Sequence, residues 1–290
     1  MPRPYSETEV VIPMDRILVG GWIPVTLPFR VKNIGNQQMR VRASMSGLSG
    51  GFSNYDVGWI GAGQEKDVVF DDVLRRGSKP ATDTEEEATL TLEYYIKGFD
   101  SSDPDKERLV NWEKVRYKLV YVDFNDDSYE VVDEDTFEED LEGWTKVDVN
   151  GDTSVQRSSE HAELSTGQWA MRHFDIGPGD EAFLSKNFTI GDVEKAYIRV
   201  CVWGLWDCDD ARFLLELITD AGNVSKRRVV PIPLTSRNKV GRPPGGDPRG
   251  SWSYFGAKLP VNGTYEVRLR VKGITGNVEL WYDDIKVVQK

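Results

Sequence analysis

The fold class is decided by the stretch TYEVRLRVKGITGNVELWYDDIKVV, residues 264–288. Apolar and charged residues alternate from Tyr265 to Lys272, which is the period-two pattern of a strand that buries one face. Residues 273–277 carry turn chemistry, and Asp283-Asp284 interrupts the second apolar run. The stretch therefore predicts three strand fragments. The last fragment should pair with an earlier strand, because an open sheet edge invites aggregation.

Short alternating segments of the same kind fill the rest of the chain. In the first half, strands are expected within residues 7–12, 25–31, 39–43, 57–73, 88–96 and 112–124, between turns rich in Gly, Asn and Pro. In the second half, the alternating segments are 181–190, 195–206, 211–223 and 251–260. The expected fold is therefore all-β, with two antiparallel β-sandwich domains.

The segment NDDSYEVVDE, residues 125–134, is strongly acidic and poorly patterned. A charge run of this sort is usually a solvated connector. A chain of 290 residues is also long for one sandwich. We therefore expect a first domain at 1–124, an acidic linker at 125–134 and a second domain at 135–290.

Two segments carry a resemblance in the first half. In VTLPFRVKNIGN, residues 25–36, a strand leads into an Asn-x-Gly turn, and ATLTLEYYI, residues 88–96, reads as a late strand. With them the first half resembles immunoglobulin-like or fibronectin-like domains of surface and virion proteins. The resemblance implies a scaffold more than an activity.

The head and the tail of the second half carry another resemblance. The head has Phe137-Glu138 and Gly143-Trp144, and the tail reads Trp281-Tyr282-Asp283-Asp284-Ile285. This half resembles galactose-binding-like jelly rolls, the fold of many carbohydrate-binding modules. The resemblance implies a jelly roll at residues 135–290 that contacts a glycan or a neighbouring subunit.

Composition narrows the classes of partner. The hydrophobic content of 39% is enough for packed cores, and the net charge of −12 opposes attraction to nucleic acid or an anionic membrane. No run approaches the roughly 18 apolar residues that suggest a membrane span. The N-terminal residues show no secretory signal. Cys201 and Cys208 are close enough in sequence for a small-loop disulfide, but two ordinary thiols remain the alternative.

Acidic residues near the two ends of the second half suggest a structural metal. If the strands that contain them pair, Glu138 would lie beside Asp283 or Asp284. Carboxylate oxygens suit calcium, and jelly rolls of the family that this half resembles often hold such an ion. Calcium is therefore a possible cofactor, and the alternative is that these acids are solvated strand ends or a bulge.

A ligand-binding wall is expected on the strand at 195–206. Ala196, Ile198, Val200 and Val202 share one strand face and should form core, which leaves the other face to line an outer wall. An exposed aromatic ring beside charged groups can stack on a sugar while those groups fix its hydroxyls. The alternative is that these aromatics pack under loops or against another subunit. The expected ligand-binding residues are Tyr197, Arg199, Trp203, Trp206, Arg212, Glu216, Trp252 and Tyr254.

A basic segment from Lys226 to Arg249 stands out in this acidic chain. Pro243-Pro244-Gly245-Gly246 precludes a helix there, so a long extended loop is expected. The loop is either a docking arm for an acidic neighbour, including another copy of the chain, or simply solvated. The residues expected to mediate assembly are Arg227, Arg228, Arg237, Lys239, Arg242 and Arg249.

Catalysis has little support in the sequence. Residues 133–138, DEDTFE, only superficially approach the carboxylate pattern of some glycoside hydrolases, and no nucleotide or hydrolase fingerprint is present. We expect a non-catalytic structural or attachment protein, most simply a virion surface component (turret, spike or decoration protein) made in the host cytoplasm. It would act as a homo-oligomer or with other structural proteins of an assembly. The alternative is an extracellular or cell-surface carbohydrate-binding module.

Overall fold

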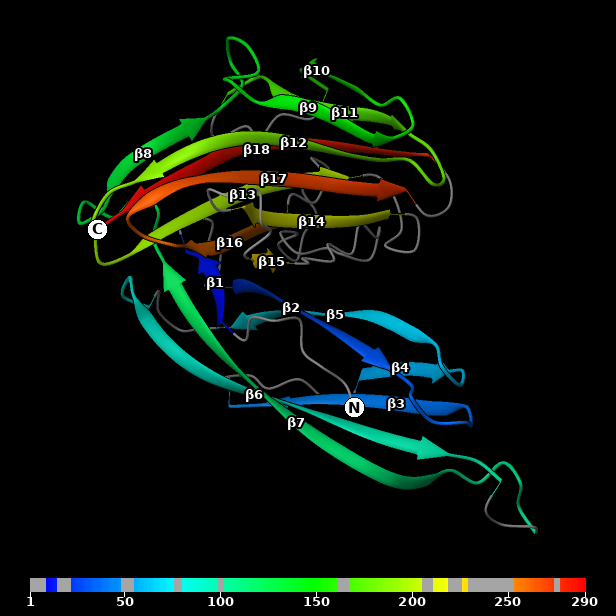
Figure 1. The fold of residues 1–290 in the computed structure, drawn as a ribbon. Coiled ribbons are helices and arrows are strands. Elements are labelled where there is room, and N and C mark those ends of the chain that lie inside the picture. The colour runs from blue at the N-terminus through cyan, green and yellow to red at the C-terminus, as the bar shows by residue number, and fades with distance from the viewer. Residues whose placement is uncertain are drawn as a thin grey trace.

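A computed structural model describes residues 9–14, 22–47, 55–75, 80–98, 102–160, 167–204, 211–218, 226–228, 253–273 and 277–290. All regular secondary structure in these ranges is β-strand, so the expected all-β class is confirmed (Figure 1). Within them we find no helix with the length and apolar character needed to cross a membrane.

The strands follow one another along the whole chain. The first are β1 (Glu9–Pro13), β2 (Trp22–Lys32), β3 (Met39–Ser46), β4 (Tyr55–Ile60), β5 (Glu65–Arg75), β6 (Thr84–Ile96), β7 (Arg108–Val122), β8 (Glu130–Asp135) and β9 (Thr145–Asn150). They continue with β10 (Ser154–Ser158), β11 (Ala170–Ile176), β12 (Glu181–Ile190), β13 (Ala196–Gly204), β14 (Ala211–Ile218), β15 (Lys226–Arg228), β16 (Ser253–Leu259), β17 (Gly263–Gly273) and β18 (Val278–Gln289).

Three sheets organise the described strands. The long sheet has the order β10-β11-β18-β13-β16-β1-β7-β6-β3-β4, and β8 also pairs with β18. The five-stranded sheet has the order β15-β14-β17-β12-β9, and β2 pairs with β5. Figure 1 shows the five-stranded sheet stacked against the β18–β13 part of the long sheet, with the β6–β7 hairpin reaching away from that body.

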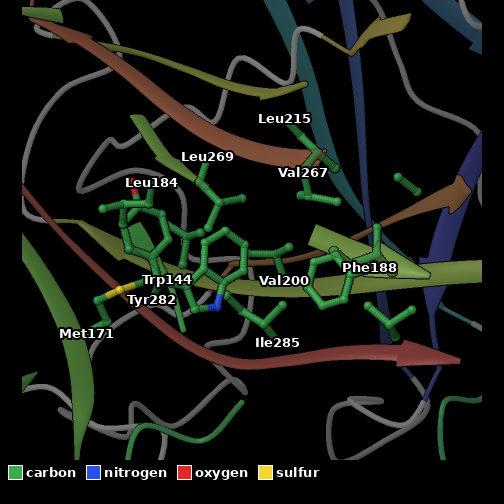
Figure 2. Close-up of a cluster of buried hydrophobic side chains, with 14 of the residues drawn as sticks. Trp144, Met171, Leu184, Phe188, Val200, Leu215, Val267, Leu269, Tyr282 and Ile285 are labelled. Carbon is green, nitrogen blue, oxygen red and sulfur yellow. The ribbon is translucent and has the colours of Figure 1, made fainter. Parts of the chain in front are cut away.

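The second half has its core between these two stacked sheets. Leu184, Leu215 and Leu269 point inward from the five-stranded sheet, and Val200 and Ile285 meet them from the long sheet (Figure 2). The alternation predicted for the end of the chain is confirmed, since the apolar residues of β17 are buried and the charged ones are not.

The first half has a separate core on one face of β3, β6 and β7. Alternate residues of these strands are buried, as their sequence pattern predicts. The Asn33–Asn36 turn also forms, and the Asn33 side chain donates to the carbonyl oxygens of Gln37 and Ile60. The buried residues of this core include Val41, Ala43, Met45, Leu90, Leu92, Val115, Tyr117 and Leu119.

The last strand differs from the prediction in two respects. β18 continues through Asp283-Asp284 as a single strand, because a bulge opposite Arg199 and Cys201 absorbs the irregularity. Asp284 lies there with a φ of 47°. The last strand pairs with an earlier one, as expected, but its partner is β8, where Asp135 faces Ile285, and not a strand beginning near Phe137.

The two halves are joined by a continuous sheet. β1 runs parallel to β7 and also pairs with β16, where Val11 faces Gly256. A Cβ atom at Gly256 would lie only 2.6 Å from Val11 Cγ1, so this close approach requires glycine. Residues 130–134, expected within a solvated linker, instead belong to β8 and pair with β18. The division into domains at 1–124 and 135–290 stays a prediction.

Candidate functional site

The outer wall predicted on β13 is not exposed. Tyr197, Arg199 and Trp203 retain only 2%, 1% and 6% of their accessible surface. Tyr197 packs edge-on against Tyr129 with ring centroids 6.0 Å apart, and Trp203 packs the same way against Trp281 at 4.9 Å. This prediction is corrected because side chains from elsewhere in the chain cover the face of β13 that points away from the main core.

The other residues predicted for that wall do not assemble around it. Glu216 is buried and lies on β14 of the five-stranded sheet, so it is in the opposite layer from Arg199. Arg212 and Tyr254 are placed only by their strand register, opposite Lys272 and Cys201. Trp206 and Trp252 lie outside the described residues.

The residues predicted to bind calcium are held by the protein itself. Asp284 forms a buried ion pair with Arg199, and each side chain is 1% exposed. The Glu138 carboxylate accepts the backbone N–H groups of Gln168 and Trp169 at 2.8 and 2.9 Å. In the described ranges no three His, Cys, Asp or Glu side chains cluster as they would around a metal ion. Calcium at Glu138, Asp283 and Asp284 therefore stays a prediction.

Cys201 is buried, and its Sγ lies 3.8 Å from the Asp284 carbonyl oxygen. Cys208 lies outside the described residues, so the disulfide stays a prediction as well.

The basic segment is described only at its start. Residues 226–228, expected as part of an extended loop, form β15, and Arg227 pairs in register with Glu216. Arg228 faces Leu215 in the same ladder. The remaining expected assembly residues lie outside the described ranges: Arg237, Lys239, Arg242 and Arg249.

The outer side of the five-stranded sheet presents a different set of polar side chains. We call it the Arg268–Arg270 face and define it by Glu181, Phe183, Glu216, Glu266, Arg268, Arg270 and Lys272. These residues point outward because their neighbours in sequence on β12 and β17 fill the core. Cross-strand register places Phe183 opposite Arg270 and Ser185 opposite Arg268. The face therefore consists of charged side chains that surround one aromatic ring, that of Phe183.

Both arginines lie over the Phe183 ring. The guanidinium carbon of Arg268 is 4.4 Å from the ring centroid, and that of Arg270 is 4.9 Å away. These are cation–π distances. Phe183 itself is 7% exposed, so the surface available to a ligand belongs to the arginines and their partners.

Carboxylates fix both guanidinium groups. Arg268 donates from Nε and Nη2 to the two oxygens of Glu266 at 2.7 and 2.8 Å. Arg270 donates from Nη1 to Glu181 at 2.7 Å and from Nε to Glu216 at 2.9 Å. Bidentate and bridging contacts of this kind hold a planar guanidinium in one orientation. The face is therefore an ordered array of donors and acceptors.

The Arg268–Arg270 face is partly open to solvent. The side chains of Arg268 and Arg270 are 24% and 12% exposed, and that of Lys272 is 51% exposed. Its three described cations, Arg268, Arg270 and Lys272, balance its three carboxylates. The surface is thus polar and near neutral in a strongly acidic chain.

Two further polar clusters are buried beneath this sandwich. Burial raises the pKa of Asp135 to about 7, although Lys186 and the Trp144 indole N–H both bond its carboxylate. Burial also lowers the pKa of His173 to about 4, and its Nε2 lies 2.9 Å from Thr153 Oγ1. Asp135 and His173 lie on β8 and β11 of the long sheet, and neither belongs to the Arg268–Arg270 face. We therefore assign both groups a structural role.

Sequence reasoning missed the Arg268–Arg270 face as a site. It predicted that the charged residues of 264–272 point outward, but it gave them no partner. The contact with Phe183 depends on the pairing of β12 with β17, which a pattern within one segment does not contain. Only Glu216 and Arg212 of the predicted ligand residues lie on the strand next to β17.

Comparison with known proteins gives a weak structural likeness. No protein-family model matches the chain, and no curated protein sequence matches it. The xylan-binding CBM22-1 domain of Paenibacillus barcinonensis Xyn10C is similar with a TM-score of 0.39 and 14% identity, over 56% of this chain and 96% of that one. TmCBM61, solved with β-1,4-galactotriose, has a TM-score of 0.39 and 15% identity, over 53% and 94%.

The K3 cleaved adhesin domain of Lys-gingipain from Porphyromonas gingivalis W83 has a TM-score of 0.40 and 16% identity, over 56% of this chain and all of that one. TM-scores this low carry no argument about function.

Proposed function

We propose that this chain is a non-catalytic glycan-binding protein and that the Arg268–Arg270 face is its sugar-binding surface. The observation that carries the proposal is the pair of guanidinium groups fixed over Phe183 by Glu266, Glu181 and Glu216. In this role the chain would work as an extracellular or cell-surface binding module. A place on a virion surface stays a prediction from the sequence.

A sugar needs donors and acceptors at fixed positions, because its hydroxyl groups project from a ring at fixed angles. The described hydrogen bonds of Arg268 use Nε and Nη2, so other N–H groups of its five remain for a hydroxyl. The carboxylates of Glu266 and Glu181, which are 26% and 24% exposed, can each accept a further hydrogen bond. Because the array is ordered before binding, less side-chain entropy is lost when the ligand arrives.

Aromatic and guanidinium surfaces also suit the less polar face of a sugar ring. A planar guanidinium that stacks on an aromatic ring is weakly hydrated, so covering its outer face costs less than covering an ammonium group. Arg268 is the better exposed of the two arginines and should contact the ligand directly. In this proposal the three carboxylates only hold the arginines in place, and they do not act as acids or bases.

The test is a glycan array with the full chain, followed by calorimetry on the strongest ligand. Arg268→Gln should weaken binding about tenfold or more, because hydrogen bonds from a charged donor are lost. Arg172→Gln is the matched control: Arg172 lies 4.7 Å over Phe174, pairs with Glu279, and has a 20% exposed side chain on β11 of the other sheet. A silent array, or equal weakening by both substitutions, would refute the proposal.

A further inference from the structure

The outer face of the first half carries a second unusual surface. We call it the Trp112 face and define it by Trp59 on β4, Arg40 and Arg42 on β3, Tyr95 on β6, and Trp112, Lys114 and Arg116 on β7. Val115 and Tyr117 of β7 are buried in the first core, so the residues that alternate with them point to the opposite side. This face is separate from the Arg268–Arg270 face and lies on a different sheet.

Three aromatic rings lie on this face, on β4, β6 and β7. Arg40 pairs with Trp59 on one side and with Tyr95 on the other. Strands lie about 4.8 Å apart, so these two rings are about 10 Å apart across the sheet. Trp112 on β7 is 58% exposed and lies opposite Glu93, which is two residues from Tyr95 on β6. Monomeric proteins seldom leave such rings uncovered without a ligand or a partner.

A cation stands over each ring. The Arg42 guanidinium carbon is 4.6 Å from the Tyr95 centroid, Lys97 Nζ is 5.2 Å from that of Trp59, and Lys114 Nζ is 5.5 Å from that of Trp112. Lys114 and Trp112 are both exposed, so this lysine can move aside and leave its ring open to a ligand, whereas Lys97 is paired with Asp105 at 3.1 Å. The Trp112 face therefore combines an aromatic ring with a positive charge at each of these three positions.

The charges of the face are only partly balanced. Arg40 pairs with Asp56 and Glu107, and Arg42 pairs with Glu107. Lys114 and Arg116 form no ion pair within the ranges that the structure describes, and their neighbours across the strand, Thr91 and Thr89, are uncharged. Lys114 beside Trp112 and Arg116 further along β7 are therefore exposed cations with no carboxylate opposite them, whereas Glu93 lies opposite Trp112 itself.

We propose that the Trp112 face binds an acidic polysaccharide, a chain of sugar rings that carries carboxylates at intervals. Aromatic rings cover the apolar faces of the sugars, while Lys114 and Arg116 pair with the carboxylates. A nucleic acid would also use aromatic and basic groups, but it carries a charge on every nucleotide. Because this protein has a strongly negative net charge, it repels a nucleic acid, with its dense charge, more than it repels a sparsely charged polysaccharide.

Calorimetry on the full chain with oligogalacturonate tests the proposal, and fully methyl-esterified oligogalacturonate provides the same backbone without charge. The acid form should bind, the ester should bind at least about tenfold more weakly, and added salt should reduce binding of the acid. Trp112→Ala should weaken binding more than about tenfold. Because Trp112 is mostly exposed, this variant should keep the thermal midpoint of the parent.

Arg116→Gln should weaken binding about fivefold. Lys258→Gln is its control, since it removes one exposed charge from β16. No binding, equal binding of acid and ester, or tighter binding of a single-stranded oligonucleotide would overturn the proposal. Loss of oligogalacturonate binding in Arg268→Gln would also overturn it, because the ligand would then occupy the other face. If Arg268→Gln still binds oligogalacturonate, the Trp112 face acts independently of the Arg268–Arg270 face, and either proposal can fail without the other.

Discussion

Replacing Asp284 by Asn should strongly destabilise the fold. Asp284 pairs with Arg199 where both side chains are 1% exposed, and Arg199 also lies 5.4 Å from the Phe124 ring of the first half. The substitution keeps the size of the side chain and removes its charge. Asn tolerates the positive φ of 47° at this position, so backbone strain adds little.

The expected loss in the free energy of unfolding comes from the Arg199 guanidinium, which stays buried after the substitution. Removing one partner of a buried ion pair costs about 3–5 kcal/mol, because the remaining buried charge loses the carboxylate that pairs with it. For a chain of this length, about 2 °C of thermal midpoint corresponds to each kcal/mol, so a fall of about 6–10 °C is expected. Arg199→Met in the same chain removes the stranded charge, and the double variant should recover most of the loss.

Urea denaturation of the parent, both single variants and the double variant gives the coupling energy as a double-mutant cycle. A coupling energy of about 2 kcal/mol or more is expected. The reasoning fails if Asp284→Asn costs less than about 1 kcal/mol. It also fails if the losses of the two single variants simply add, because the two groups would then act independently.

Three further measurements address other buried groups. Because burial lowers the pKa of His173 from 6.5 to about 4, the unfolded chain takes up its proton first, and the unfolding free energy should fall by about 3 kcal/mol as pH drops through that window. His173→Gln should flatten this dependence in urea titrations at several pH values, and an unchanged slope would exclude His173 as its source. Trp144→Phe loses the indole bond of 2.9 Å to buried Asp135 and should cost about 1–3 kcal/mol by denaturation, whereas a neutral effect would contradict the bond's role. A calcium ion held by Glu138 and the Asp283-Asp284 pair requires that a chelator lower the thermal midpoint, and no change would remove that site.

Alternation within a segment predicted which residues form the core. Ile198 and Val200 on β13, and Val267 and Leu269 on β17, are all buried as the period of two requires. The same pattern could not tell what lies on the other side of β13. Tyr197 is buried there by Val11, Val120 and other residues from the first half, and that contact depends on long-range packing.

Both proposed binding faces were hidden for the same reason. The sequence indicates that Arg268 and Trp112 belong to strands, but not which residues lie beside them. Phe183 reaches Arg268 through the register of β12 and β17, and Trp59 comes to the same face as Tyr95 and Trp112 through the register of β3, β4, β6 and β7. Register is set by turns and by burial across the whole sheet, so a single segment does not reveal it.

The position of β1 bears on how the protein is synthesised. β1 leaves the ribosome before both of its neighbours, β7 and β16, and β16 emerges long after it. Until then one flank of the nascent N-terminal sheet has no neighbour, and exposed flanks of this kind attract other chains. Expression yield should therefore depend on elongation speed and on chaperones that shield this flank. Slowing translation just ahead of the β16 codons should increase the insoluble fraction.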